Sequence, residues 1–283
     1  MILMLIVTAC YTITSLSDKY AVSRLKMDGN TLTWLMAAAT SLFMIAYLPF
    51  DSLLFTLSWQ SFAAVGLMVL SKLLEFRLSA IVLKEMSAFE LKAWLGVTVL
   101  FSYITDLVCG SAGTIAVIIC RLAFIAATAA GLFMIARSGG ERVHYKKIIL
   151  PLAGYLLAKF GYGLIVNMTK EYISSTLSLF IALVILTIVL APAVHPIRLF
   201  KEKTKGSVII ALTKIPNVIG LILENAIAAQ SMANYSFIQP MILAALFFIG
   251  LFRREQVSRL NIAGGIVCIA GVLGFQAVPL IIH

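Results

Sequence analysis

The stretch Gly206–Gln230 is long and apolar enough to cross a membrane, yet it carries charged side chains. About 25 residues at roughly 1.5 Å each give a helix of about 37 Å, which spans a bilayer. On a helical projection, its polar residues Lys214, Asn217, Glu224 and Asn225 fall within roughly 100° of one another. A charge at the bilayer centre costs about 2.5–3.5 kcal/mol, so such groups usually face a bundle interior or a water-filled cavity.

Pro216 lies inside the same stretch. Because proline has no N–H, the carbonyl of Leu212 loses its helical donor, and the sequence predicts a kink beside Lys214. Together, the polar face and the kink indicate the wall of a polar cavity inside a membrane protein.

The composition places the whole chain in the membrane class. Its 283 residues are 61 % hydrophobic and 12 % charged, and the mean hydropathy is +1.04. Soluble domains carry about 25 % charged residues, so a polytopic membrane protein is indicated. The net charge of +10 fits basic loops on anionic lipid, and no nucleic-acid partner is expected.

The sequence contains no pattern that predicts an enzyme, a cofactor or a metal. The cysteines Cys10, Cys109, Cys120 and Cys268 lie in or at the ends of apolar runs and are predicted to be packing residues. There is no H-E-x-x-H, G-x-S-x-G or Walker pattern, and every His lies in a predicted loop or at the terminus. Any energy that the protein uses must then come from a gradient or from solute exchange.

Ten apolar runs have spanning length. They cover residues 2–21, 31–50, 60–83, 87–107, 112–136, 148–168, 174–194, 206–231, 236–252 and 260–281. A polar linker at 138–147 divides them into halves at 1–137 and 148–283, each with five helices. The predicted fold class is therefore an all-α polytopic membrane protein of ten transmembrane helices.

The halves are weakly similar to each other. The shift that places Glu75 on Glu224 also places Ser87 on Ser236 and acidic Asp106 on the acidic residue after helix 9. Because each half has an odd number of helices, the second must be inverted in the membrane. Such inverted five-helix repeats are typical of transporters, with the binding site near the midplane.

The last helix of each half carries a ridge of small residues, which allows close helix approach. Ordinary packing within the chain and a dimer contact are both open explanations, so the chain is expected to be a monomer or a homodimer. The ridges are Ala116, Cys120, Ala123 and Ala127 in the first half, and Gly264, Cys268, Gly271 and Gly274 in the second.

Several of these features resemble a known family. Asp106 follows helix 4, the run 251–255 (LFRRE) follows helix 9, Gln239-Pro240 opens helix 9, and glycines recur in 259–274. This pattern is similar to that of the drug/metabolite transporter superfamily, EamA type, although that family usually has Glu at the position of Asp106. The resemblance implies a transporter role and a central cavity surrounded by helices 1, 3, 4, 6, 8 and 9.

The loop charges predict an orientation. Nearly all loop Lys and Arg residues follow odd-numbered helices, whereas Lys170 follows an even-numbered one. The positive-inside rule then places both termini outside a plasma membrane, while the family resemblance implies the reverse.

Polar faces on four predicted helices supply the candidate binding residues. Lys72 and Glu75 share a face of helix 3, either as a self-neutralising pair or as part of a substrate site. Lys159 and Lys214 have no acid within one helical turn, which favours a site role. Asp18 and Lys19 are expected to pair with each other at the interface. The full candidate set is Tyr11, Lys72, Glu75, Lys159, Tyr162, Lys214, Asn217 and Glu224.

These residues predict a secondary transporter that works by alternating access. The excess of lysine over glutamate favours a small anionic or zwitterionic metabolite, with lysine as the anchor. The alternative is a proton-coupled exporter of cationic drugs or metabolites that uses Glu75 or Glu224. The expected partners are a small-molecule substrate, the lipid bilayer, and a coupling proton or exchanged solute.

Overall fold

Helices form all the regular structure of the computed structural model, which describes residues 2–86, 88–95, 98–108, 114–138, 145–252 and 259–281. Across these ranges there is no β-strand, only an isolated bridge between Phe55 and Ile173. The prediction of an all-α protein is confirmed. The elements are α1 (Ile2–Ser23), α2 (Gly29–Met44), η1 (Leu48–Phe50), α3 (Trp59–Glu85), α4 (Ala88–Leu95), α5 (Thr98–Val108), α6 (Ile115–Ser138), α7 (Tyr145–Thr169), α8 (Ser175–Val194), α9 (Pro196–Leu212), α10 (Lys214–Gln230), α11 (Met232–Phe252) and α12 (Arg259–Ile281).

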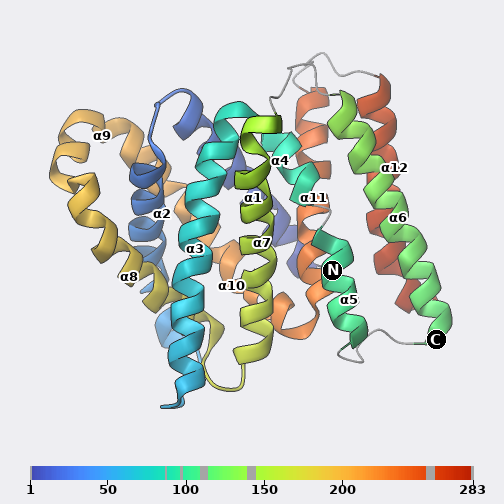
Figure 1. Cartoon of the computed structure of the whole chain (residues 1–283), viewed down its shortest axis with the longest axis horizontal. Helices are drawn as coiled ribbons and strands as arrows, with labels where there is room; N and C mark the ends of the chain where they lie inside the picture. The colour runs from blue at the N-terminus through green and yellow to red at the C-terminus, as the bar shows by residue number, and fades with distance from the viewer. Residues whose placement is uncertain are drawn as a thin grey trace.

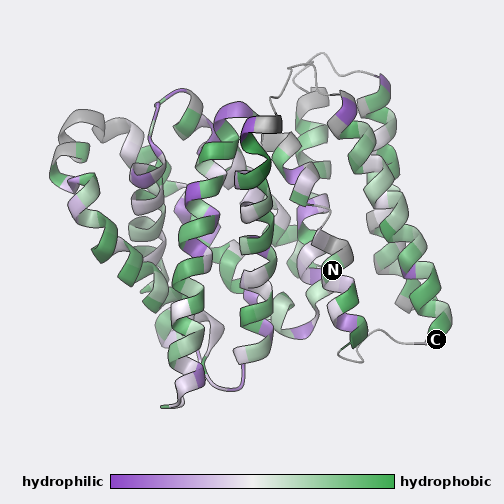
Figure 2. Cartoon of the chain, in the orientation of Figure 1, coloured by the Kyte–Doolittle hydropathy of each residue, from purple (hydrophilic) through white to green (hydrophobic). Residues whose placement is uncertain are grey.

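Five segments of the described chain are long and apolar enough to cross a membrane. They are Ile2–Val22, Ile115–Ile135, Lys147–Thr169, Ser175–Val194 and Gly206–Gln230. Large apolar side chains such as Phe133, Leu157 and Ile188 are about two-thirds exposed, which suits contact with lipid. Figure 2 shows that apolar residues make up much of the helices along the ribbon. These findings fit a membrane protein, while the ten separate spans and the inverted relation of the halves stay predictions.

The span predicted at 206–231 matches the apolar segment Gly206–Gln230, but a turn at Thr213 divides it into α9 and α10. The break lies beside Leu212, whose carbonyl cannot receive a helical bond from Pro216, so the predicted kink becomes an interruption. The first piece, α9, also begins well before the predicted start. Its first residue is Pro196, which follows His195 in the left-handed region at φ 48°.

Other boundaries also move. The run predicted at 31–50 is helical only to Met44 and continues through the short η1, and α11 begins at Met232 instead of 236. The run predicted at 87–107 appears as α4 and α5, and α6 and α7 flank the predicted linker. Some predicted features lie outside the described residues: Ser87, Cys109, the acidic residue after helix 9, and 139–144 of the linker.

Polar side chains fix several helix ends. Asp28 caps α2 by accepting from the N–H groups of Asn30 and Thr31. Asp106, at the end of α5, accepts from the Ser231 hydroxyl at 2.8 Å and from the Met232 N–H at 3.0 Å. Asp106, one of the residues from which the repeat was predicted, therefore caps the start of α11.

Helices α6 and α12 pack against each other, side by side in Figure 1, and the glycines of the predicted α12 ridge lie at this contact. A Cβ atom built on Gly131 would lie 2.5 Å from the backbone nitrogen of Cys268 and 2.6 Å from the carbonyl oxygen of Gly264. The two backbones therefore touch, which only glycine allows. The predicted α12 ridge thus packs within the chain, whereas Ala116 and Ala123 of the predicted α6 ridge are exposed, and the dimer contact stays a prediction.

The remaining helices pack in pairs that join the two halves. Helix α3 packs along α7, α1 along α10, and α2 along α8. Figure 1 shows α3 beside α7 in the middle of the molecule. Helices α1, α3, α7, α10 and α11 thereby surround a common interior, where the buried charged side chains lie.

Candidate functional site

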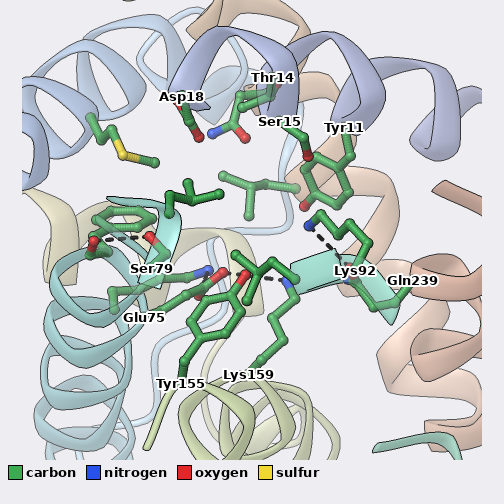
Figure 3. A pocket seen from close by; sticks show the side chains of 17 residues that line it. Tyr11, Thr14, Ser15, Asp18, Glu75, Ser79, Lys92, Tyr155, Lys159 and Gln239 are labelled. Carbon is green, nitrogen blue, oxygen red and sulfur yellow. Dashed lines mark hydrogen bonds and ion pairs between the residues drawn. The ribbon is translucent and has the colours of Figure 1, made fainter. Parts of the chain in front are cut away.

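A polar cavity opens between helices of both halves (Figure 3). Its volume is about 70 Å³, enough for a few waters or a small solute. The lining comes from α1, α3, α4, α7, α10 and α11, with α2 contributing Met36. The polar and aromatic lining residues are Tyr11, Thr14, Ser15, Asp18, Lys72, Glu75, Phe76, Ser79, Lys92, Tyr155, Lys159, Asn217 and Gln239.

Four charged side chains form a chain of ion pairs along one side of the cavity. Lys72 Nζ lies 2.7 Å from Glu75 Oε2, and Lys159 Nζ lies 3.5 Å from Glu75 Oε1. Lys159 Nζ then lies 2.7 Å from Glu224 Oε1. The side chain of Glu224 is fully buried and that of Lys72 is 1 % exposed. The signs alternate along the chain, so each buried charge is compensated.

Tyrosine side chains surround the four ion-paired residues, and their hydroxyl groups donate hydrogen bonds to these residues or to a neighbouring amide. The Tyr11 hydroxyl donates to Glu224 Oε2, and the Tyr235 hydroxyl donates to the carbonyl of Lys159 at 2.6 Å. The Tyr162 hydroxyl donates to Asn225 Oδ1, while its ring lies under Lys72 Nζ at 3.7 Å from the centroid. Cation–π contact of this kind stabilises a desolvated ammonium.

A second ion pair joins α10 to α1. Lys214 Nζ donates to Asp18 Oδ1 at 2.6 Å, and the lysine is fully buried. The predicted pair between Asp18 and Lys19 is wrong, because each residue has another partner. Lys19 Nζ donates to the carbonyls of Leu83 and Met86, at 2.7 and 3.0 Å, and so satisfies the end of α3.

The structure confirms that the predicted polar faces are buried and brings most of them together. Of the eight candidates, Tyr11, Lys72, Glu75, Lys159 and Asn217 line the cavity, and Asn217 also donates to Thr40 Oγ1 at 3.4 Å. Tyr162, Glu224 and Lys214 lie behind the lining, bonded as described above.

The sequence argument did not identify the partners of two buried lysines. Lys159 and Lys214 have no acid within one helical turn, but each pairs with a carboxylate on another helix. Cross-helix packing, which single-helix periodicity does not report, supplies these partners. Lys72 and Glu75 do pair at i, i+3, and the pair also continues to Lys159.

Sequence reasoning missed Lys92, because the count of loop charges included this residue although it lies inside the run predicted at 87–107. It lies in α4, points into the cavity (Figure 3), and donates to Gln239 Oε1 of α11 at 3.1 Å. Among the described residues no carboxylate lies within 4.0 Å of Lys92 Nζ. The signal that could have found it is its position five residues into an apolar run on a helix that the resemblance places at the cavity.

Other charged groups lie apart from the cavity. The Arg121 guanidinium lies over the Phe275 ring, 4.8 Å from its centroid, and does not line the cavity. In the described part of the chain, no cluster of three His, Cys, Asp or Glu side chains could hold a metal ion. The arrangement is suited to binding a polar solute through lysine, hydroxyl and amide groups.

Comparison with known proteins does not assign this chain to a family. No protein-family model matches the chain, and no curated protein matches it.

Proposed function

We propose that this protein is a secondary transporter that carries a small anionic metabolite by alternating access. The observation that carries the proposal is the polar cavity, which is built from helices of both halves and lined by charged side chains. Charged groups are costly inside a membrane and usually mark a substrate or ion pathway. Transporters hold their sites between two such halves, near the midplane.

The pairing of helices supports two inverted repeats. If the halves correspond helix by helix, the contact of α3 with α7 is the counterpart of the contact of α10 with α1, and both occur. The terminal helices α6 and α12 also pack on each other, as do α2 and α8. These contacts are those expected when two halves are related by a twofold axis.

The ion pairs suggest where the halves move. Lys72 pairs with Glu75 within the first half, and Lys159 pairs with Glu224 within the second, each at 2.7 Å. The contact between Lys159 and Glu75 crosses the halves and is longer, at 3.5 Å. Rocking would therefore separate the Lys159–Glu75 contact before the Lys214–Asp18 pair, which also crosses the halves but at 2.6 Å.

The contacts of the carboxylates favour an anion over a cation. Asp18, Glu75 and Glu224 each lie within 2.7 Å of a lysine ammonium. A cationic drug would have to displace a lysine from one of them. Export of cations through Glu75 or Glu224 is thus the second reading, separated from the first by experiment.

The loop charges support insertion in the plasma membrane with both termini outside, and the coupling would come from a gradient or an exchanged solute. Neither Walker nor other nucleotide-binding patterns occur in the sequence.

The test is solute exchange by purified protein in liposomes. We expect uptake of small organic anions that is lost in Lys159→Met and retained in Lys84→Gln, an exposed lysine at the end of α3. Folding of each variant is checked by its melting temperature. Export of a lipophilic cation that Glu75→Gln or Glu224→Gln abolishes, with no anion uptake, would select the second reading instead.

A further inference from the structure

Lys92 differs from the other lysines at the cavity in the charge of its partner. Lys72 and Lys159 each lie 2.7 Å from a carboxylate oxygen, and Lys214, just behind the lining, lies 2.6 Å from one. Lys92 contacts the neutral amide oxygen of Gln239 at 3.1 Å. An ammonium in a low-dielectric site is stabilised far more by an anion than by an amide.

Among the residues that the structure describes, the charges around the cavity therefore leave the Lys92 ammonium without a carboxylate partner. Lys72, Lys159 and Lys214 are matched by Glu75, Glu224 and Asp18. One monovalent anion beside Lys92 would complete the balance. A dianion would instead bring one uncompensated negative charge into the site, at the cost of burying it.

A zwitterion fits less well, because its ammonium group would need a carboxylate of its own. Glu75 already lies near two lysine ammonium groups, at 2.7 and 3.5 Å. Asp18 is bonded to Lys214 at 2.6 Å, and Glu224 accepts from both Lys159 and Tyr11. None of the three carboxylates offers a site without a cationic partner.

The space beside Lys92 suits a small molecule with hydroxyl or carbonyl groups. The cavity volume of about 70 Å³ is far below the roughly 300–1,000 Å³ of drug-sized pockets. Its remaining polar groups are neutral donors and acceptors, including Thr14, Ser15 and Ser79. Figure 3 shows Lys92 and Gln239 reaching into this space from α4 and α11.

We propose that Lys92 and Gln239 form the anion subsite of the cavity, and that its ligand is a small monocarboxylate. The ligand carboxylate accepts from Lys92 Nζ, and the Gln239 amide, released from that contact, is free to bond the ligand. This inference rests on the proposed transport function and specifies its substrate class.

The test measures the melting temperature of the purified full-length protein with sodium lactate, sodium phosphate, alanine or choline chloride at matched ionic strength. We expect lactate to raise the melting temperature, since a ligand that binds only the folded state stabilises it. Lys92→Gln should weaken lactate binding by roughly tenfold to hundredfold, because a charge-assisted hydrogen bond is lost. Lys92→Arg should keep part of the response, and Lys84→Gln all of it.

Gln239→Glu is the most specific variant, because it nearly preserves side-chain size and supplies an internal carboxylate to Lys92. We expect its melting temperature without ligand to equal or exceed that of the wild type, and its response to lactate to be lost. The inference is overturned if Lys92→Gln and Gln239→Glu respond to lactate like the wild type. It is also overturned if phosphate, alanine or choline stabilises the wild type and lactate does not.

Liposome exchange separates this inference from the proposed function. Exchange of phosphate or alanine without exchange of lactate would leave an anion or zwitterion transporter and remove the monocarboxylate assignment. Failure to exchange any of these solutes would remove both.

Discussion

Lys159 on α7 and Glu224 on α10 are 65 positions apart in the chain, yet Nζ of one lies 2.7 Å from Oε1 of the other. Both side chains are buried, and Glu224 also accepts from the Tyr11 hydroxyl of α1. The pair thus joins three helices at the cavity.

Removing one member of this pair should destabilise the protein strongly. Glu224→Gln leaves the Lys159 ammonium with only its longer contact to Glu75, and breaking a buried pair in this way costs about 3–5 kcal/mol. In the double variant Lys159→Met/Glu224→Gln no buried charge of the pair remains. We expect its melting temperature to exceed that of Glu224→Gln, which thermal unfolding in detergent would measure. A double variant that melts at the sum of the two single losses would contradict the pairing.

Tyr11→Phe tests the hydrogen bond that the Tyr11 hydroxyl donates to Glu224. The ring keeps its packing against Gly220, while one hydrogen bond to a buried carboxylate is lost. We expect a loss of about 1.5–3 kcal/mol in unfolding free energy. Tyr20→Phe, at an exposed position of the same helix, should leave the melting temperature unchanged. Equal behaviour of the two variants would contradict the assigned bond.

Gly131→Ala tests the contact between α6 and α12. The new Cβ would meet backbone atoms at 2.5–2.6 Å, so the two helices must separate. We expect a loss of about 1–3 kcal/mol, as for other overpacked sites. Gly66→Ala is the matched control, since nothing lies within 4 Å of its Cβ position. Alanine there should be neutral or stabilise α3 by about 0.5–1 kcal/mol. Comparison of the two melting temperatures decides the outcome.

The cap of α2 gives a prediction that depends on pH. Partial burial disfavours the charged form of Asp28, but hydrogen bonds from the Thr31 hydroxyl and from the N–H groups of Thr31 and Asn30 outweigh it and lower the pKa of Asp28. The stability from this shift is present above the ordinary pKa of the carboxyl, about 3.9, and is lost as the pH falls through the lowered value.

Asp28→Ala should therefore cost about 1 kcal/mol at neutral pH, the usual worth of an N-cap. The difference from the wild type should shrink when melting temperatures are measured below about pH 4. Asp28→Ser keeps a capping oxygen without a titrating group. The difference in melting temperature between Asp28→Ser and Asp28→Ala should therefore stay constant over the same pH range. A difference between wild type and Asp28→Ala that is constant with pH would be evidence against the charged cap.

The parts of this fold that follow from single-helix patterns could be predicted from the sequence. The face shared by Lys214, Asn217 and Glu224 is buried as its spacing indicated, because the cost of charge in lipid acts on each helix separately. The interruption beside Pro216 followed from a missing N–H.

The partners of those residues could not be predicted in the same way. Which carboxylate faces Lys159 or Lys214 depends on how separate helices pack, and helical periodicity carries no such information. Lys92 was missed because it lies near the start of its apolar run, where a helix residue and a loop residue have the same sequence context.

The position of Glu75 between two lysines has a consequence for how the chain is inserted. Segments are synthesised from the N-terminus, so α3 and α7 are present before α10. In the folded protein Lys159 Nζ lies 3.5 Å from Glu75 Oε1, and both residues are made before Glu224, the closer partner of Lys159. Glu75 would then compensate the charge of Lys159 during membrane insertion, and Glu224 would become its closer partner once α10 has been inserted.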